Sequence, residues 1–151
     1  MCTPCSGRNA GTNYDVWMVD ASFFSVMFAG IVSMVIAFVW YDARVFGGAW
    51  GRMTNLTPEM VERGKKKMPL MASAGLLANM FAAYVMSYFG VAWGVYDIVG
   101  AIELGFWCWA GFVAPTMLGM VLWEQKPFAL YLINAGYWLV SLIVMAVVLV
   151  L

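Results

Sequence analysis

The residues of this chain that could do chemistry are mostly neutral hydrogen-bonding side chains inside long apolar runs. The last run, from Pro127 to Leu151, contains five of them: Tyr131, Asn134, Tyr137, Trp138 and Ser141. At about 100° per residue they fall within an arc of roughly 120° on one helix face. Such a face either hydrogen-bonds a neighbouring helix or lines a small polar pocket, and the sequence leaves both alternatives open.

The preceding apolar run contains a proline, which leaves one backbone carbonyl of its helix without a hydrogen-bond donor. Pro115 cannot donate to the carbonyl of Gly111, and a carbonyl freed in an apolar environment must find another donor. Counting residues from the turn between the two runs, we expect Tyr137 or Ser141 to donate to Gly111. The predicted arrangement is the polar face of the last helix packed on the Gly/Pro face of the helix before it.

Three further polar positions are candidates for a ligand or a structural bond. We expect Asn134 to pair with Thr116, which the same residue count places within a turn of it. Asn79 lies in the middle of an earlier apolar run and is expected to hydrogen-bond another helix, a ligand role being the alternative. Glu103 precedes twenty uncharged residues, 104–123, so we expect it at the outer membrane surface and keep a deeper proton or cation site as the alternative.

Several kinds of chemistry are disfavoured by composition. The chain has no His, which is the commonest zinc and haem ligand and the usual base of a nucleophilic triad. Cys2, Cys5 and Cys108 cannot complete a four-thiolate site, and Cys108 lies in an apolar run that disfavours the reactive thiolate. The Cys2-Thr3-Pro4-Cys5 segment suits an irregular tail, with or without a local disulfide, better than a catalytic dithiol, because no strand and helix surround it. We therefore predict no catalytic residue, no cofactor and no metal site.

The composition also indicates that most of the protein surface contacts lipid rather than water. Hydrophobic residues make up 64% of the 151 residues and charged residues 11%, against about 45–50% and about 25% in soluble domains. The predicted fold class is an all-α integral membrane protein with four transmembrane helices and a short cytoplasmic amphipathic segment between the first two. A formal net charge of zero argues against a nucleic-acid partner, so the partner we expect is the lipid bilayer.

The four helices and the segments between them can be placed along the chain. A polar N-terminal tail, residues 1–20, precedes one four-helix transmembrane domain, residues 21–151. Within the loop after the first span, Thr57 is a plausible helix N-cap and Pro58 suits the first helical position. Small residues in the second span, at Ala74, Ala78 and Ala82, are spaced for close helix packing. The expected spans are about 21–40, 68–90, 98–123 and 127–151.

The basic residues predict the orientation. The loop between the first two spans carries six Lys and Arg residues, whereas the tail carries Arg8 alone. Under the positive-inside rule this loop is cytoplasmic and both termini are outside. The end of the loop also offers an alternative function, contact with anionic lipid headgroups. The residues concerned are Arg63, Lys65, Lys66 and Lys67.

Several of these segments together resemble a known family. They are Trp40-Tyr41, Phe46-Gly47 with Trp50, Thr57-x-Glu59-x-x-Glu62 leading to the lysines, the Gly111 to Thr116 segment and the Ile133 to Ser141 segment. The chain resembles the family called domain of unknown function 1761 over most of its length from Trp40 onward. This resemblance implies a small four-helix protein of a bacterial-type inner membrane, and it implies no established activity.

Three functions are compatible with these residues. The first is a non-enzymatic membrane component, a homo-oligomer or an accessory subunit of a larger membrane complex, because small residues are abundant and ionisable groups are scarce. The second is a small-solute permease or channel-like protein that uses a polar site between helices 3 and 4. The third is an enzyme acting on lipid or quinone, for which the expected catalytic groups are missing.

Overall fold

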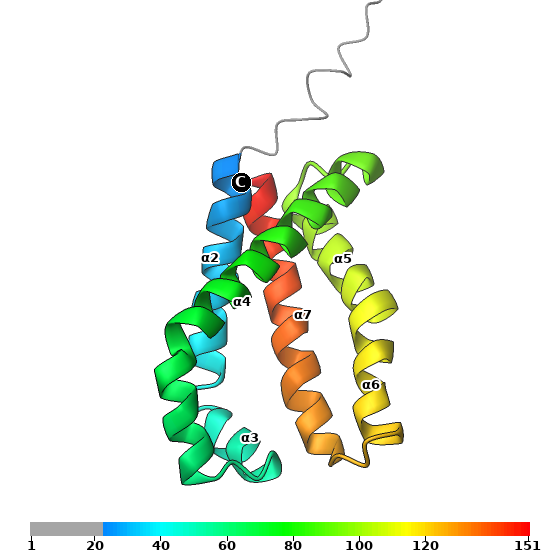
Figure 1. The fold of residues 1–151 in the computed structure, drawn as a ribbon. Coiled ribbons are helices and arrows are strands. Elements are labelled where there is room, and N and C mark those ends of the chain that lie inside the picture. Colours follow the sequence, from blue (N-terminus) through cyan, green and yellow to red (C-terminus); the bar gives the residue numbers. More distant parts are fainter. Residues whose placement is uncertain (1–22) are drawn as a thin grey trace, which may run out of the picture.

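The computed structural model describes residues 23–151, and these form seven helical segments without a strand (Figure 1). Cys2, Cys5, Arg8 and the predicted tail lie outside the described residues. Four helical stretches are long and apolar enough to cross a membrane, which confirms the all-α, four-span fold class. In chain order the segments are α2 (Phe23–Trp40), α3 (Gly47–Met53), α4 (Pro58–Trp93), α5 (Ile98–Cys108), η1 (Trp109–Val113), α6 (Ala114–Leu122) and α7 (Phe128–Val150).

Helix α7 is the centre of the bundle. In Figure 1 it runs between α2 on one side and α5 and α6 on the other, while α4 runs diagonally across α2 and α7, from the lower left of the view to the upper right. The core consists of small and apolar side chains from four helices. It includes Ala29 of α2, Ala83 of α4, Ala101 and Leu104 of α5, and Met145 and Ala146 of α7.

Two glycines allow the closest helix contacts. A Cβ added at Gly105 would lie 2.7 Å from the Ile143 Cα of α7, and one added at Gly30 would lie 2.7 Å from the Met80 Cγ of α4. Small residues at such points let helix backbones approach closely in lipid, where packing contacts replace the hydrophobic driving force. These two contacts place α5 next to α7 and α2 next to α4.

Helix α4 is one continuous helix that includes the second half of the preceding loop. The Thr57 hydroxyl accepts a hydrogen bond from the Met60 N–H at 3.3 Å, and Pro58 occupies the first turn, as the sequence predicts. The helix ends at Gly94, whose φ of +67° is the left-handed conformation that favours glycine. Its 36 residues reach about 54 Å, well beyond the ~30 Å of a hydrocarbon core.

The face that α4 presents to the bundle differs from the predicted one. Asn79, Ala83 and Met86 are its buried residues, whereas Ala74 and Ala78 are exposed. Of the predicted row of alanines, Ala82 alone is half-buried and packs against the core, so the row as a whole is not the contact surface within this chain. The buried face follows from the close approach of α2 at Met80, which the alanine spacing does not reveal.

The third span is interrupted at its proline. Trp109–Val113 is a π-helical turn between α5 and α6, in which the Ala114 N–H donates to the Trp109 carbonyl five residues earlier. The Thr116 hydroxyl donates to the carbonyls of Phe112, at 2.6 Å, and Val113, at 2.9 Å. Neither carbonyl is the one that Pro115 deprives of a backbone donor, so Thr116 does not meet the demand that the proline creates.

The two ends of the molecule differ in charge. Segment 41–67 and the α6–α7 turn lie at one end, whereas the start of α2, the α4–α5 turn and the end of α7 lie at the other (Figure 1). The first end carries seven of the eight Lys and Arg residues against four carboxylates. A net charge of zero therefore conceals an unequal distribution of Lys and Arg between the two ends, and such an asymmetry is the signal that the positive-inside rule uses.

Candidate functional site

The polar face of α7 meets α2 near the basic end of the molecule. The Tyr41 hydroxyl donates to the Asn134 Oδ1 at 3.0 Å, and the Trp40 indole N–H donates to the Ile133 carbonyl at 3.0 Å. One turn of α7 therefore receives two hydrogen bonds from the end of α2. Because the partners are 93 residues apart in sequence, these bonds hold the two spans in register.

The opposite side of the same turn of α7 receives a third bond. The Trp109 indole N–H, from the π-helical turn, donates to the Ala135 carbonyl at 2.8 Å. Trp40 and Trp109 thus donate from two neighbouring helical segments to α7 carbonyls that are two residues apart. An indole N–H has no acceptor in hydrocarbon, so each bond removes the cost of an unpaired donor.

A fourth polar contact lies deeper in the bundle. Ser33 of α2 and Ser141 of α7 share a hydrogen bond of 2.6 Å, and both side chains are fully buried. Each hydroxyl satisfies the other without an ionisable group. The pair is therefore a neutral helix-to-helix bond at membrane depth.

Aromatic rings surround the Tyr41–Asn134 bond. The centroid of the Tyr41 ring lies 5.5 Å from the Tyr137 ring centroid and 5.8 Å from the Trp50 ring centroid. The ring centroids of Trp40 and Phe46 are 4.7 Å apart. We call these rings, with Asn134, the aromatic cluster. It joins α2, α3 and α7 and is assembled from three separate segments of the chain, all of which carry the family resemblance.

The environment of Tyr41 keeps its hydroxyl protonated. Burial, and secondarily the neighbouring Tyr137, raise the pKa of Tyr41 from 10.0 to about 12. The neutral form is therefore favoured in the folded state. Because the unfolded chain loses this proton first, the contribution of Tyr41 to stability is complete below pH 10 and is lost as the pH rises towards 12.

Tyr41→Phe tests this bond. At neutral pH the variant should lose about 0.6 kcal/mol of unfolding free energy, the average for a hydrogen bond between membrane helices. Between pH 10 and about 12 the wild type should lose stability more steeply than the variant. Thermal unfolding in detergent at pH 8 and pH 11.5 measures both effects. Tyr96→Phe, at a side chain that is 80% exposed, is the matched control, and parallel pH profiles for wild type and Tyr41→Phe would contradict the assignment.

The hydrogen bonds predicted between the last two spans are wrong. Asn134 pairs with Tyr41 rather than Thr116, and Ser141 pairs with Ser33 rather than the Gly111 carbonyl. The polar face of α7 does point inward, but towards α2. On its other side α7 contacts α5 without such hydrogen bonds, because the backbone of α5 at Gly105 lies close to the backbone of α7 at Ile143.

The Gly/Pro segment of the third span faces outward. Gly111, Pro115 and Thr116 are exposed, and nothing lies within 4 Å of a Cβ added at Gly111. Residue counting from the turn predicts only the depth of this segment along α7. It cannot show the rotation of the helix, which the π-helical turn changes.

The two remaining candidates lie apart from the aromatic cluster. Asn79 is 8% exposed and faces the bundle, yet within residues 23–151 no hydrogen bond to its amide is found. Glu103 is exposed on α5, five residues after the first residue of that helix. The lipid-headgroup candidates Arg63, Lys65, Lys66 and Lys67 are all exposed near the start of α4.

Sequence reasoning missed the α2 half of the site. Ser33, Trp40 and Trp109 carry three of the four interhelical bonds, and none was predicted as a partner of α7. One signal was available: Ser33 is a hydroxyl in the middle of the first span, whose other hydroxyl, Ser25, lies near its start. The sequence identifies Trp40 as a membrane-interface residue, and this does not indicate that its indole N–H donates to α7.

The hydrogen bonds of this arrangement join α7 to α2 and to the π-helical turn. Within residues 23–151, every side-chain nitrogen or oxygen that is itself fully buried has a hydrogen-bond partner, whereas the amide of Asn79, a residue that is 8% exposed, has none. The same residues contain no group of three His, Cys, Asp or Glu side chains that could hold a metal ion. The arrangement can fix helix positions and exclude water.

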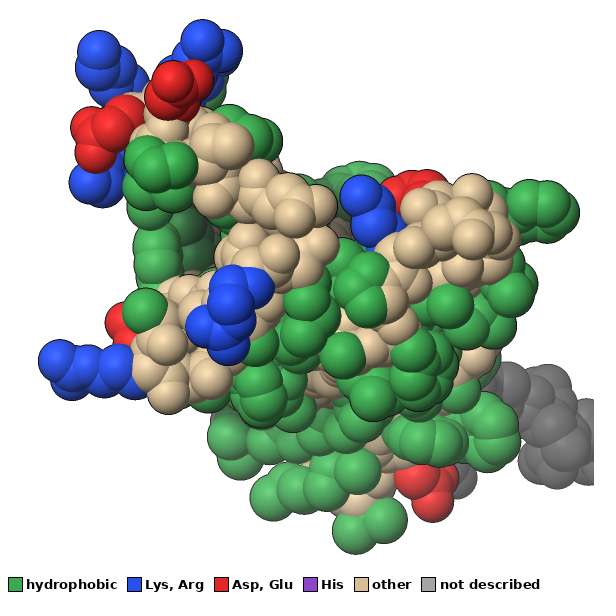
Figure 2. Space-filling view, turned by 90° about the horizontal axis from the view of Figure 1, so that it is seen from below, with side chains coloured by type: hydrophobic (Ala, Val, Ile, Leu, Met, Phe, Trp, Pro, Cys, Tyr) green, Lys and Arg blue, Asp and Glu red, His purple; other side chains and the backbone are tan. Residues whose placement is uncertain are grey.

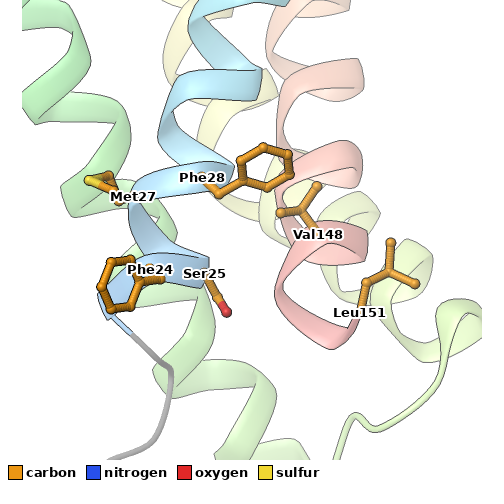
Figure 3. A pocket seen from close by; sticks show the side chains of 6 residues that line it. All are labelled: Phe24, Ser25, Met27, Phe28, Val148 and Leu151. Atoms are coloured by element: carbon orange, nitrogen blue, oxygen red, sulfur yellow. The ribbon is translucent and has the colours of Figure 1, made fainter.

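A separate hollow of about 470 Å³ lies at the opposite end of α2 and α7. Figure 3 shows Phe28 and Val148 facing each other from the two helices, with Ser25 the single hydroxyl among the labelled residues. Ser25 is about 24 Å along α2 from Tyr41, so this hollow is not part of the aromatic cluster. Its lining suits acyl chains of the surrounding lipid.

Comparison with known proteins gives one family. The model of a family described as "Protein of unknown function (DUF1761)" matches residues 24–150. Neither the curated proteins nor the solved structures contain a match to this chain. The family match covers all four spans, the aromatic cluster and the outward-facing Gly/Pro segment.

Proposed function

The chain belongs to the DUF1761 family of proteins of unknown function, and we propose that it is a non-enzymatic membrane component that acts through assembly, as a homo-oligomer or an accessory subunit of a membrane complex. The observation that carries this proposal is the outward-facing Gly111 to Thr116 segment. We call this segment the Gly/Pro face.

The Gly/Pro face combines a gap in the side-chain surface with an unmet hydrogen-bond demand. Pro115 has no N–H, so in an α-helical register the Gly111 carbonyl loses its backbone donor, and in a π-helical register the Ala110 carbonyl does. Gly111 is thirteen residues from one end of the span and eleven from the other, near the middle of the membrane. Acyl chains offer no donor at that depth, whereas a neighbouring helix does.

A second helix would also find room on this face. No atom lies within 4 Å of a Cβ added at Gly111, and both Gly111 and Pro115 are exposed. Close approach at glycine brings backbones together and is the usual way in which helices associate in lipid. Tyr41 and Trp40 of the aromatic cluster donate their hydrogen bonds to α7 inside the bundle, whereas the Gly/Pro face is exposed.

Gly111→Leu tests the proposal. Leucine fills the gap and favours the helix by up to about 1 kcal/mol, so a loss of assembly would not reflect a weakened span. In mild detergent the wild type should elute as one defined oligomer or with a stoichiometric partner, and the variant should dissociate, as measured by light scattering and native mass spectrometry. Gly75→Leu, at an exposed glycine of α4, is the matched control and should leave assembly intact.

A wild-type protein that is a dispersed monomer and binds nothing would overturn the proposal. The geometry gives no support to the alternative, a permease with a polar site between the third and fourth spans. The polar side chains of α7 bond to α2, and the Gly/Pro face points away from them. An enzyme acting on lipid or quinone likewise gains no group from the described residues.

A further inference from the structure

The first ten residues of α4 extend beyond the membrane-spanning part of the helix. Met68 begins an uncharged stretch that continues to Tyr96, so the hydrocarbon boundary lies at Lys67 and Met68. Residues 58–67 therefore form an uninterrupted helical extension at the basic end of the molecule. These residues are exposed, apart from Gly64, which is half-buried.

Four basic side chains of this extension lie at one level. Arg63, Lys65, Lys66 and Lys67, which we call the basic collar, are within about 6 Å of the boundary along the helix axis. The headgroup layer on each side of a bilayer is about 5–8 Å thick. The collar therefore coincides with the layer that contains the lipid phosphates.

The collar keeps most of its charge. Lys65 pairs with Glu62 at 2.8 Å, and both side chains are about two-thirds exposed. In the part of the chain that the structure describes, this is the one ion pair, which leaves Arg63, Lys66 and Lys67 available. Figure 2, seen from the basic end, shows Lys and Arg side chains projecting from the margin of a largely apolar surface.

The helical positions favour several small ligands over one large one. Lys65, Lys66 and Lys67 follow one another at about 100° per residue and cover an arc of about 200°. A single protein or nucleic-acid surface on one side of the helix would reach only part of this arc. Separate phosphate groups arranged around the helix would reach all of it.

We propose that the basic collar binds the phosphate groups of anionic phospholipids in the leaflet at the basic end of the protein. Each lysine ammonium binds a headgroup phosphate as a point charge, and the long aliphatic stems of Lys66 and Lys67 pack along the apolar surface below. The binding site would hold α4 at a fixed depth while the spans pack below it. This role is independent of the assembly proposed for the Gly/Pro face.

The test uses the full chain in mixed micelles containing equal amounts of phosphatidylglycerol and phosphatidylcholine. Bound lipid is measured by mass spectrometry after purification. The wild type should retain phosphatidylglycerol preferentially, and K65Q/K66Q/K67Q should lose the preference by up to about 100-fold, about fivefold for each lysine. K65R/K66R/K67R should retain it, because it keeps the charge. Micelles remove any effect of the substitutions on orientation in the cell.

Three results would overturn the proposal. The first is equal preference for the anionic lipid in the wild type and the glutamine variant. The second is loss of preference in the arginine variant, which would mean that the fold rather than the charge was affected. The third is displacement of the lipid by a duplex oligonucleotide at 0.15 M salt, which would assign the collar to nucleic acid. Light scattering of the glutamine variant shows separately whether assembly survives.

Discussion

Replacing Gly105 by alanine will separate α5 from α7 and lower the unfolding free energy by about 3 kcal/mol, the upper part of the usual range for overpacking. The added Cβ would lie 2.7 Å from the Ile143 Cα, 2.9 Å from the Ile143 nitrogen and 3.0 Å from the Leu142 carbonyl carbon. All three are backbone atoms, so no side-chain rotation relieves the clash. The whole of α5 must shift.

Cys108 provides a local measurement of this separation. It is the one free cysteine in the described part of the chain and lies buried one turn from Gly105, in the core cluster with Leu104 and Leu142. In a background with Cys2 and Cys5 replaced by serine, maleimide should label Cys108 at least about tenfold faster in Gly105→Ala, because about 1.4 kcal/mol already shifts an opening equilibrium tenfold. Thermal unfolding in detergent gives the global effect.

Gly75→Ala is the matched control. Nothing lies within 4 Å of a Cβ at Gly75, so the same substitution should stabilise α4 by about 0.5–1 kcal/mol and leave Cys108 protected. Equal labelling rates in wild type and Gly105→Ala would show that the α5–α7 contact is looser than the structure indicates. The comparison isolates backbone contact from any general effect of adding a methyl group.

Replacing Gly47 by alanine should have a comparable effect on the other side of α7, about 3 kcal/mol. A Cβ at Gly47 would collide with the Tyr41 carbonyl oxygen and would lie 2.9 Å from the Asp42 carbonyl carbon. The Gly47 N–H also donates to the Asp42 carbonyl at 2.9 Å, so the turn after α2 is closed at this point. Opening it displaces Tyr41 from Asn134 and Trp50 from Tyr41.

The measurement is near-ultraviolet circular dichroism, which reports the fixed packing of the aromatic cluster, together with thermal unfolding. Gly51→Ala is the control, since it lies four residues later in the same short helix and nothing lies within 4 Å of its added Cβ. It should keep the aromatic signal and raise stability slightly. An unchanged signal in Gly47→Ala would mean that the cluster does not depend on this turn.

The sequence predicts those features that depend on local composition. Uncharged runs long enough to cross a bilayer identify four spans, because a charge inside hydrocarbon is costly. Thr57 and Pro58 identify the start of α4, because a hydroxyl that binds an orphan N–H and a proline that lacks one both suit the first turn. These arguments need only neighbouring residues.

Sequence periodicity determines that the polar face of α7 must meet protein, and tertiary structure alone decides which helix it meets. Asn134 and Ser141 need hydrogen-bond partners at membrane depth, and a hydroxyl on any neighbouring helix satisfies that need equally well. The choice of α2, through Tyr41 and Ser33, follows from shape: Gly105 lets α5 approach the other side of α7 through its backbone, without polar bonds. The π-helical turn then rotates Gly111 and Pro115 outward, so the face that the sequence assigns to the interior becomes the exposed surface on which we propose that a partner binds.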